Sequence, residues 1–299
     1  MSNRLSDVQA RIATVHELES VVGAMRGIAA ARSREARSRL DGIRACAAVI
    51  GAAIGDALML DARNAPRASS ATGVGGSTHL VIVLCAEQGF VGPFNEHMIE
   101  AAAQRQHTEV TEYLVIGDRG VAIAHERELA VVWSAPMAAH TDEVAALADR
   151  ITAALYERLE AGHATRVTLL HAVPQLATTI EIARKSLLPF DFERFAMPAR
   201  RIAPLVTLAP QRLLAQLAEE YVFAQLCEAI MLSFAAENEA RMQAMIAARA
   251  NVHDKLDQLI GDSRRLRQEE ITAEIVELSS GELASGAATR NRPSRRERF

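Results

Sequence analysis

Both ends of the chain carry long stretches in which apolar residues recur at helical spacing without a proline. The N-terminal stretch covers residues 3–58, since the first proline is Pro66. Its apolar positions, three and four residues apart, are Leu5, Val8, Ile12, Val15, Leu18, Val22 and Met25, followed by Leu40, Ile43, Ala47, Ile50, Ile54 and Ala57. This period is typical of a coiled-coil seam and predicts one helix of roughly 80 Å.

A second helical stretch extends from about Gln211 to Ser280, with no proline and a single glycine, Gly261. Its apolar residues repeat every seven positions at Met245, Val252, Leu259 and Leu266, with Leu256 between them. A helix of that length would span roughly 105 Å, far more than a small globular domain needs. We therefore expect the two stretches to pair in antiparallel orientation and to project as a rod.

Between the two helices the pattern changes to short apolar runs that alternate with helical stretches. The runs are His79–Cys85, Tyr113–Ile116, Ala130–Trp133, Val167–Ala172 and Thr178–Leu187, and the helical stretches are Glu96–Gln106 and Asp142–Ala161. Alternating strands and helices indicate an α/β unit with a mainly parallel sheet. The predicted fold class is α/β: a Rossmann-like domain inserted between two very long N- and C-terminal helices that form an antiparallel coiled coil.

This organisation predicts four segments along the chain. They are a coiled-coil helix at 1–60, an α/β foot domain at 61–207, a second coiled-coil helix at 208–281, and a basic, flexible tail at 282–299. The tail is rich in arginine, and we interpret it as a frayed and solvated terminus.

Composition limits the class of protein further. Hydrophobic residues make up 49% of the chain, aromatic residues 4%, and the net charge is −4, which favours a folded chain with small-residue helix packing. The three cysteines, Cys46, Cys85 and Cys227, are few and widely separated, so we expect neither a disulfide framework nor a cysteine zinc site. No apolar run of about 18 residues is free of charge, so we expect no direct insertion into a bilayer.

Lysine usage argues against a nucleotide site. Only two of the 33 basic residues are lysine, Lys185 and Lys255, and they follow Arg184 and Asp254 rather than glycine. A P-loop requires Gly-Lys followed by Ser or Thr to hold nucleotide phosphates, so this chain has none. Any link to ATP must therefore act through a partner.

Other motifs are weak. The segment from Gly117 to Gly120 lacks the third glycine of a dinucleotide fingerprint, so we interpret it as a strand-to-helix turn. The nine histidines include no His-Glu-x-x-His motif, and His171 is expected to be a buried or edge residue of a strand. We predict no catalytic residues, no cofactor, no metal and no nucleic-acid partner.

The two ends of the chain nevertheless carry specific motifs. The first runs from Arg11 to Arg32 and contains Val22-Gly-Ala-Met25. The second is Glu237-Asn-Glu-Ala-Arg241-Met242-Gln-Ala-Met245 with Asn251, and the third is Arg267-Gln268-Glu-Glu-Ile-Thr272-Ala-Glu274 with Glu277. In order and separation these segments resemble the terminal helices of the F-type ATP synthase gamma subunit, and the resemblance covers nearly the whole chain.

The resemblance implies a central rotor shaft without a catalytic site of its own. Such a shaft couples ion flow through the membrane c-ring to conformational changes at catalytic beta subunits. Its expected partners are the hexameric ring of alpha and beta subunits, the epsilon subunit and the c-ring. Its expected place is the cytoplasmic face of the plasma membrane, as a peripheral protein.

The matched motifs also imply which residues contact partners. These are Met25, Arg32, Arg34, Arg241, Met242, Arg267, Gln268, Thr272 and Glu274. An arginine at 267 suits a bidentate bond to a carboxylate of a beta-subunit loop, although spacing alone equally allows a solvated helix face. The N-terminal arginines Arg26, Arg32, Arg34, Arg37, Arg39 and Arg44 either face acidic loops of beta subunits or are ordinary surface charge.

One loop departs from the family pattern. Members usually carry Asp-Arg-Gly-Leu-Cys-Gly-Gly-x-Asn after the first strand, whereas this chain has Glu87-Gln-Gly-Phe-Val-Gly-Pro-Phe-Asn95. Gly89, Gly92 and Asn95 are kept, and the difference suggests a divergent paralogue of the alternate or sodium-linked type. Two other functions stay open: a Rossmann-domain protein that binds a small molecule, and a coiled-coil scaffold without motor function.

Overall fold

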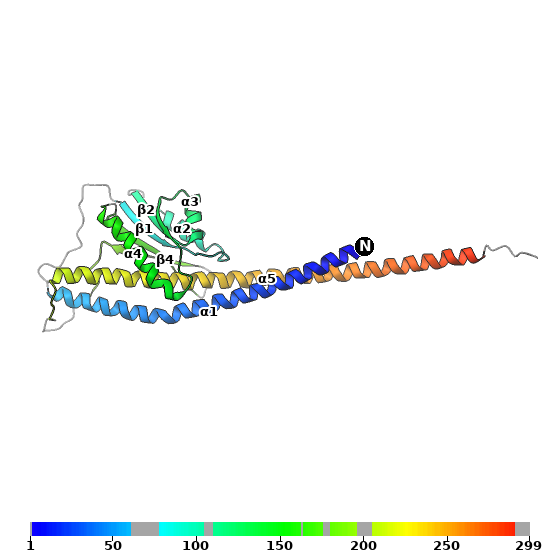
Figure 1. Cartoon of the computed structure of the whole chain (residues 1–299), viewed down its shortest axis with the longest axis horizontal. Coiled ribbons are helices and arrows are strands. Elements are labelled where there is room, and N and C mark those ends of the chain that lie inside the picture. Colours follow the sequence, from blue (N-terminus) through cyan, green and yellow to red (C-terminus); the bar gives the residue numbers. More distant parts are fainter. Residues whose placement is uncertain are drawn as a thin grey trace, which may run out of the picture. The chain divides into compact units, whose positions relative to one another are not determined.

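The computed structural model describes residues 2–60, 78–104, 110–162, 164–175, 180–195 and 205–290, with side chains from residue 4 to residue 278 (Figure 1). Its elements in chain order are α1 (Ser2–Leu60), β1 (Thr78–Leu84), α2 (Phe94–Ala103), β2 (Val110–Ile116), α3 (Asp118–Glu126), β3 (Val131–Ala135), the 3-10 turn η1 (Thr141–Glu143), α4 (Val144–Glu160), β4 (Arg166–Val173), β5 (Glu181–Leu188) and α5 (Pro210–Arg290). The α/β fold with two very long terminal helices is confirmed. Helix α3 follows the predicted strand-to-helix turn, although it was not among the predicted helical stretches, and α5 continues ten residues beyond the predicted end at Ser280, to Arg290.

The chain divides into two units. One comprises residues 25–245, and the other combines residues 1–24 with residues 246–299. Helices α1 and α5 contribute to both units, whereas the sheet belongs to the first alone.

The sheet of unit 25–245 has the strand order β3-β2-β1-β4-β5. Strands β1, β2, β3 and β4 pair in parallel, and β5 pairs with β4 in antiparallel orientation, so the predicted mainly parallel sheet is confirmed. The central strand β1 is buried on both faces from Leu80 to Leu84. This explains why its sequence is a continuous apolar run rather than an alternating one.

Two hydrophobic layers cover the sheet. On one face, Leu80, Ile82 and Leu84 pack against α4, against Ala36 and Leu40 of α1, and against α5. On the other face, Val81 and Val83 pack against α2 and α3. The inserted domain thus uses the paired long helices as part of its own core, which fastens it to them.

Helices α1 and α5 run antiparallel within this unit. Arg37 pairs with Glu239, and Arg44 Nε lies 2.9 Å from Glu228 Oε1. Increasing residue numbers along α1 therefore meet decreasing residue numbers along α5. The predicted seam positions Leu40, Ala47, Ile54 and Ala57 are buried, and Ile43 and Ile50 are half-buried. The spacing of apolar residues in this part of α1 therefore identified its packed face correctly.

The other unit contains the same kind of pairing. Val22 of α1 is buried, as are Val252, Leu256 and Leu259 of α5, and Arg249 Nη2 lies 3.5 Å from Glu19 Oε1. The prediction of Leu18 as a seam residue was wrong, because its side chain is 48% exposed. The packed face instead passes through Val15, Glu19 and Val22. Steps of four and then three residues fit a helix as well as the predicted steps of three and then four through Leu18.

Helix α1 also passes a composition test for a membrane span. Between Arg4 and Leu60 it contains an 18-residue window with mean hydropathy 1.8 and at most two charged residues. The apolar residues Ile54, Ala57 and Leu58 at its C-terminal end are buried against Leu214 of α5 and neighbouring aromatic rings. Packing within the protein therefore accounts for these three residues, while 28% of the window as a whole is buried.

Candidate functional site

The carboxyl ends of β1 and β4 mark the position where a Rossmann-like sheet usually binds a ligand. These two strands are neighbours at the centre of the sheet, and the chain leaves them in opposite directions across it. Ligands of open α/β sheets bind in the crevice at such a switch point. In this chain the loop after β1, residues 85–93, and helix α5 meet there.

Internal hydrogen bonds shape the loop after β1. The Glu87 Oε2 atom accepts bonds from the backbone N–H of Asp118 at 3.2 Å and of Met137 at 2.8 Å. Asn95 is buried, and its Oδ1 accepts a bond from the N–H of Ala86 at 2.8 Å. Asn95 thus ties the start of α2 to Ala86 after β1, whereas Glu87 ties the loop to the segments that follow β2 and β3. The substituted Glu87 therefore has a structural function.

Arg241 fastens this loop to α5. Its Nε donates to the carbonyl of Gly89 at 3.3 Å, and its Nη2 donates to the carbonyl of Gln88 at 3.2 Å. Nη2 also lies 2.6 Å from Glu237 Oε1, and the side chains of both residues are buried. Burial raises the pKa of Glu237, and the neighbouring guanidinium opposes that shift.

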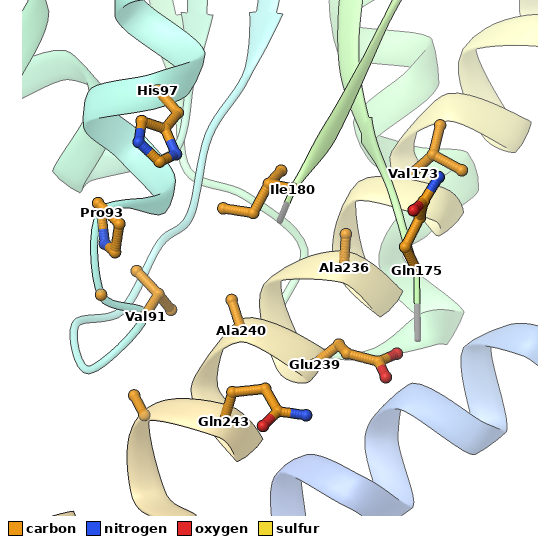
Figure 2. A pocket seen from close by; sticks show the side chains of 12 residues that line it. Val91, Pro93, His97, Val173, Gln175, Ile180, Ala236, Glu239, Ala240 and Gln243 are labelled. Carbon is orange, nitrogen blue, oxygen red and sulfur yellow. The ribbon is translucent and has the colours of Figure 1, made fainter. Parts of the chain in front are cut away.

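A pocket of about 190 Å³ remains beside this clamp (Figure 2). Figure 2 shows its walls: the loop before α2 with Val91 and Pro93, His97 of α2, the end of β4 at Val173, and α5 with Ala240. Ligand pockets usually measure about 300–1,000 Å³, so this one is too small for a dinucleotide. Helix α5 forms one wall of this pocket.

The glycine turn after β2 is explained by packing. Gly117 has a φ of 97°, and a Cβ there would lie 2.6 Å from the carbonyl oxygen of Cys85. A Cβ on Gly120 would overlap the side chain of Cys85. Both glycines let α3 approach β1, so the interpretation of this segment as a strand-to-helix turn fits the structure, and close packing alone accounts for its glycines.

The residues predicted to contact partners differ in exposure within unit 25–245. Arg34 is exposed, and Met25, Arg32 and Met242 are half-buried. Arg241 is the exception, because its guanidinium is used in the internal clamp. Arg241 therefore holds the loop after β1 to α5, a function that the motif match did not suggest.

The other basic residues of the N-terminal helix divide into two groups. Arg37 pairs with Glu239, Arg39 with Glu35 and Asp142, and Arg44 with Glu228. For these three arginines, contacts within the chain support the interpretation as ordinary surface charge. Among the described residues no ion pair forms at Arg32 or Arg34, so both guanidiniums remain suited to a partner.

The four predicted contact residues near the end of α5 lie in the other unit. Arg267, Gln268, Thr272 and Glu274 are all exposed, as are the apolar neighbours Ile271 and Ile275. The Thr272 hydroxyl donates to the carbonyl of Gln268 at 2.8 Å, which keeps it on the helix. This segment therefore presents charged, polar and apolar side chains together on a helix surface.

Outside this region, the described residues offer few reactive or metal-ligating side chains. All three cysteines are free thiols, and within the described ranges no group of three His, Cys, Asp or Glu side chains is arranged to hold a metal. His171 is buried in β4, as its strand position indicated.

The fold and the filled crevice define a class of protein: an α/β domain fastened to a pair of long antiparallel helices. The family model described as ATP synthase matches residues 4–284. The ATP synthase gamma chain of Fuscovulum blasticum is 29% identical over 290 residues, with 93% of this chain and 98% of the relative covered. That of Rhodospirillum rubrum is 27% identical over 298 residues, with 93% and 98% covered.

Solved structures support the fold. A chain from the Euglena gracilis mitochondrial ATP synthase in rotational state 3 aligns with a TM-score of 0.64 at 12% identity and covers 100% of both chains. A chain from the central stalk and c-ring of the Tetrahymena thermophila mitochondrial ATP synthase gives a TM-score of 0.56 at 20% identity, with 76% of this chain and 99% of that chain covered. Because the family match spans nearly the whole sequence, the chain belongs to the ATP synthase gamma family. The family's gamma subunit is the central rotor shaft of the membrane-associated F1 complex.

Proposed function

We propose that the chain is the central rotor shaft of an F-type ATP synthase or ATPase, working at the cytoplasmic face of the plasma membrane. It couples ion flow through the membrane c-ring mechanically to conformational changes at catalytic beta subunits. Its partners are the alpha and beta ring, the epsilon subunit and the c-ring. The observation that carries this proposal is the family match over residues 4–284, which includes both long helices and the inserted domain.

Rotation is coupled to catalysis because the shaft contacts the different conformations of a beta subunit with different free energies. A shaft shifts a beta subunit among its nucleotide states only as far as it contacts those states unequally. Torque also has to pass from the α/β domain to the helices. The shared core, the Arg241 clamp and the ion pairs of Arg37 and Arg44 with α5 form the rigid connection that this requires.

Contact with the catalytic ring is assigned to the exposed residues near the end of α5. Arg267 offers a planar fork of donors that fits a carboxylate of a beta-subunit loop. Gln268, Thr272 and Glu274 add polar contacts, and on α1 Met25, Arg32 and Arg34 are assigned the same function. Met242 is half-buried and contributes apolar area, whereas Arg241 acts through the loop that it holds.

Reconstitution tests the proposal. The purified chain should not hydrolyse ATP, and a stable ATPase should form when it is mixed with the alpha and beta subunits encoded with it. In the full complex, Arg267→Gln should lower ATP-driven ion pumping relative to ATP hydrolysis. Arg265→Gln is the matched control, because Arg265 is exposed, pairs with Asp262 and points about 160° away from Arg267 around the same helix. Failure to assemble with alpha and beta subunits would refute the shaft function.

The two alternatives make different predictions. A small-molecule enzyme should retain a dinucleotide on purification, which the 190 Å³ pocket at the switch point disfavours. A scaffold without motor function should tolerate removal of residues 267–280 without loss of ATPase coupling.

A further inference from the structure

A second, more open pocket of about 460 Å³ lies between α1, β5 and α5, away from the clamp. Its walls carry three cations, Arg44 of α1, Lys185 of β5 and Arg194 of the segment after β5. They carry a single carboxylate, Glu228 of α5, and the ring of Tyr221. The pocket therefore brings three positive charges from different elements toward one negative charge.

Glu228 is shared by two of these cations. Its Oε1 lies 2.9 Å from Arg44 Nε, and its Oε2 lies 3.7 Å from Lys185 Nζ. The side chain of Lys185 is one-third exposed and that of Arg44 about half exposed, so both heads reach solvent. One carboxylate leaves this group of three cations with an excess of two positive charges.

Arg194 is held by aromatic rings instead of a carboxylate. Its guanidinium carbon lies 4.6 Å from the ring centre of Tyr221, 4.9 Å from that of Phe195 and 5.3 Å from that of Phe190. Among the described residues it forms no ion pair. Stacking fixes the plane of a guanidinium while leaving its edge N–H groups free to bind an anion.

Two further observations indicate that the pocket suits a polar ligand. The Oε1 atom of Gln225, a residue of this wall that is 4% exposed, has no hydrogen-bond partner in the described structure. Burial lowers the pKa of Lys185, Glu228 opposes this shift, and the neighbouring Arg194 and Arg44 lower the pKa further. A buried acceptor without a partner is costly. The hydroxyl of a hydrogen-phosphate dianion, or one on the group that a monoester carries, can donate to Gln225 while the phosphate oxygens accept bonds from the cations.

We propose that this pocket binds a small phosphate-bearing anion, either inorganic phosphate or a phosphate monoester, through Arg44, Lys185 and Arg194. A phosphate dianion matches the excess of two positive charges, and its oxygens accept bonds from several donors at once. The volume exceeds that of phosphate alone, and the Tyr221 ring offers an apolar wall to the group that a monoester carries. By bridging α1, β5 and α5, the anion strengthens the junction between the sheet and the paired helices.

Isothermal titration calorimetry of the full-length chain with inorganic phosphate, at ionic strength matched with chloride, tests this site. Lys185→Gln and Arg194→Gln should each weaken phosphate binding about tenfold, as expected for loss of one charge-assisted contact. Glu228→Gln should tighten it, because the competing carboxylate is removed. The matched control is Arg150→Gln, an exposed arginine of α4 outside the pocket, which should leave the affinity unchanged.

The opposite signs separate binding from structural damage, because a structural effect of Glu228→Gln would weaken rather than tighten phosphate binding. No heat of phosphate binding to the wild-type chain, or equal affinity in all variants, would overturn the proposal. So would binding of acidic partner peptides, but not phosphate, at these residues.

Vesicles distinguish the two sources of a phosphate group. Co-sedimentation with phosphatidylcholine vesicles that contain phosphatidic acid, lost in Lys185→Gln and displaced by free phosphate, would support the site with a lipid headgroup as its ligand. Phosphate binding without co-sedimentation would support it with a soluble phosphate as its ligand.

Discussion

The guanidinium of Arg241 lies 2.6 Å from the carboxylate of Glu237 one helical turn earlier, and both side chains are buried. The same guanidinium donates to the carbonyls of Gln88 and Gly89. One side chain thus neutralises a buried acid and fastens the loop after β1 to α5. This contact narrows the crevice at the switch point of the sheet, where a pocket of about 190 Å³ remains.

Replacing Arg241 by Gln should destabilise the protein strongly. Removal of one partner from a buried ion pair leaves an uncompensated charge, at a cost of about 3–5 kcal/mol. The double variant Glu237→Gln with Arg241→Gln should cost less than the sum of the two single changes, since no buried charge remains. Urea unfolding measures both, with Arg150→Gln as the surface control. Simple additivity of the two changes would contradict a coupled pair.

His171 should make stability depend on pH in the mildly acidic range. Burial in β4 lowers its pKa below the ordinary value of 6.5, Lys185 lowers it further, and Glu228 opposes the shift. As pH falls below 6.5, the unfolded chain takes up a proton that the folded chain does not, so stability is lost until the folded pKa is passed. In His171→Gln this part of the dependence should disappear. Urea unfolding between about pH 5 and pH 7 tests it, and an unchanged slope would refute it.

Two glycine substitutions should have opposite effects on stability. Gly120→Ala places a methyl group against Cys85, and overpacking of this kind costs about 1–3 kcal/mol or more. Gly42→Ala in α1 meets nothing within 4 Å, so it should stabilise the helix by about 0.5–1 kcal/mol. Thermal unfolding of the two variants measures the difference. A stable Gly120→Ala variant would contradict the close approach of α3 to β1.

The long helices could be predicted from the three- and four-residue spacing of their apolar residues, and the strands from their short apolar runs. Leu40, Ala47 and Ile54 are buried as their spacing indicated, and the apolar run of β1 lies at the centre of the sheet. Leu18 was misassigned because steps of three and four residues are interchangeable on a helix, and only the partner helix decides between Leu18 and Glu19. Helix α3 has nine residues, about two and a half turns, which is short for a helical period to repeat.

The site was less predictable, because it depends on contacts between distant residues. Nothing local to Arg241 shows that the carbonyls of residues 88 and 89 lie within its reach, 152 and 153 residues earlier in the chain. The cations Arg44, Lys185 and Arg194 are likewise far apart in sequence and meet only through the pairing of β5 with β4 and of α1 with α5. Arg267 and Thr272 lie beyond Leu259, the last buried residue among the described part of α5, and both are exposed.

Rotation of the α/β domain relative to the alpha and beta ring is the direct test of whether this chain is a rotor shaft. The alpha and beta ring would be fixed to a surface and a bead attached to the α/β domain of this chain through an engineered surface cysteine. If the chain is a rotor shaft, ATP should drive the bead around in one direction, in one step for each catalytic beta subunit. Steady ATP hydrolysis by the assembled complex, with the bead only fluctuating about one position, would contradict the function of this chain as a rotor shaft.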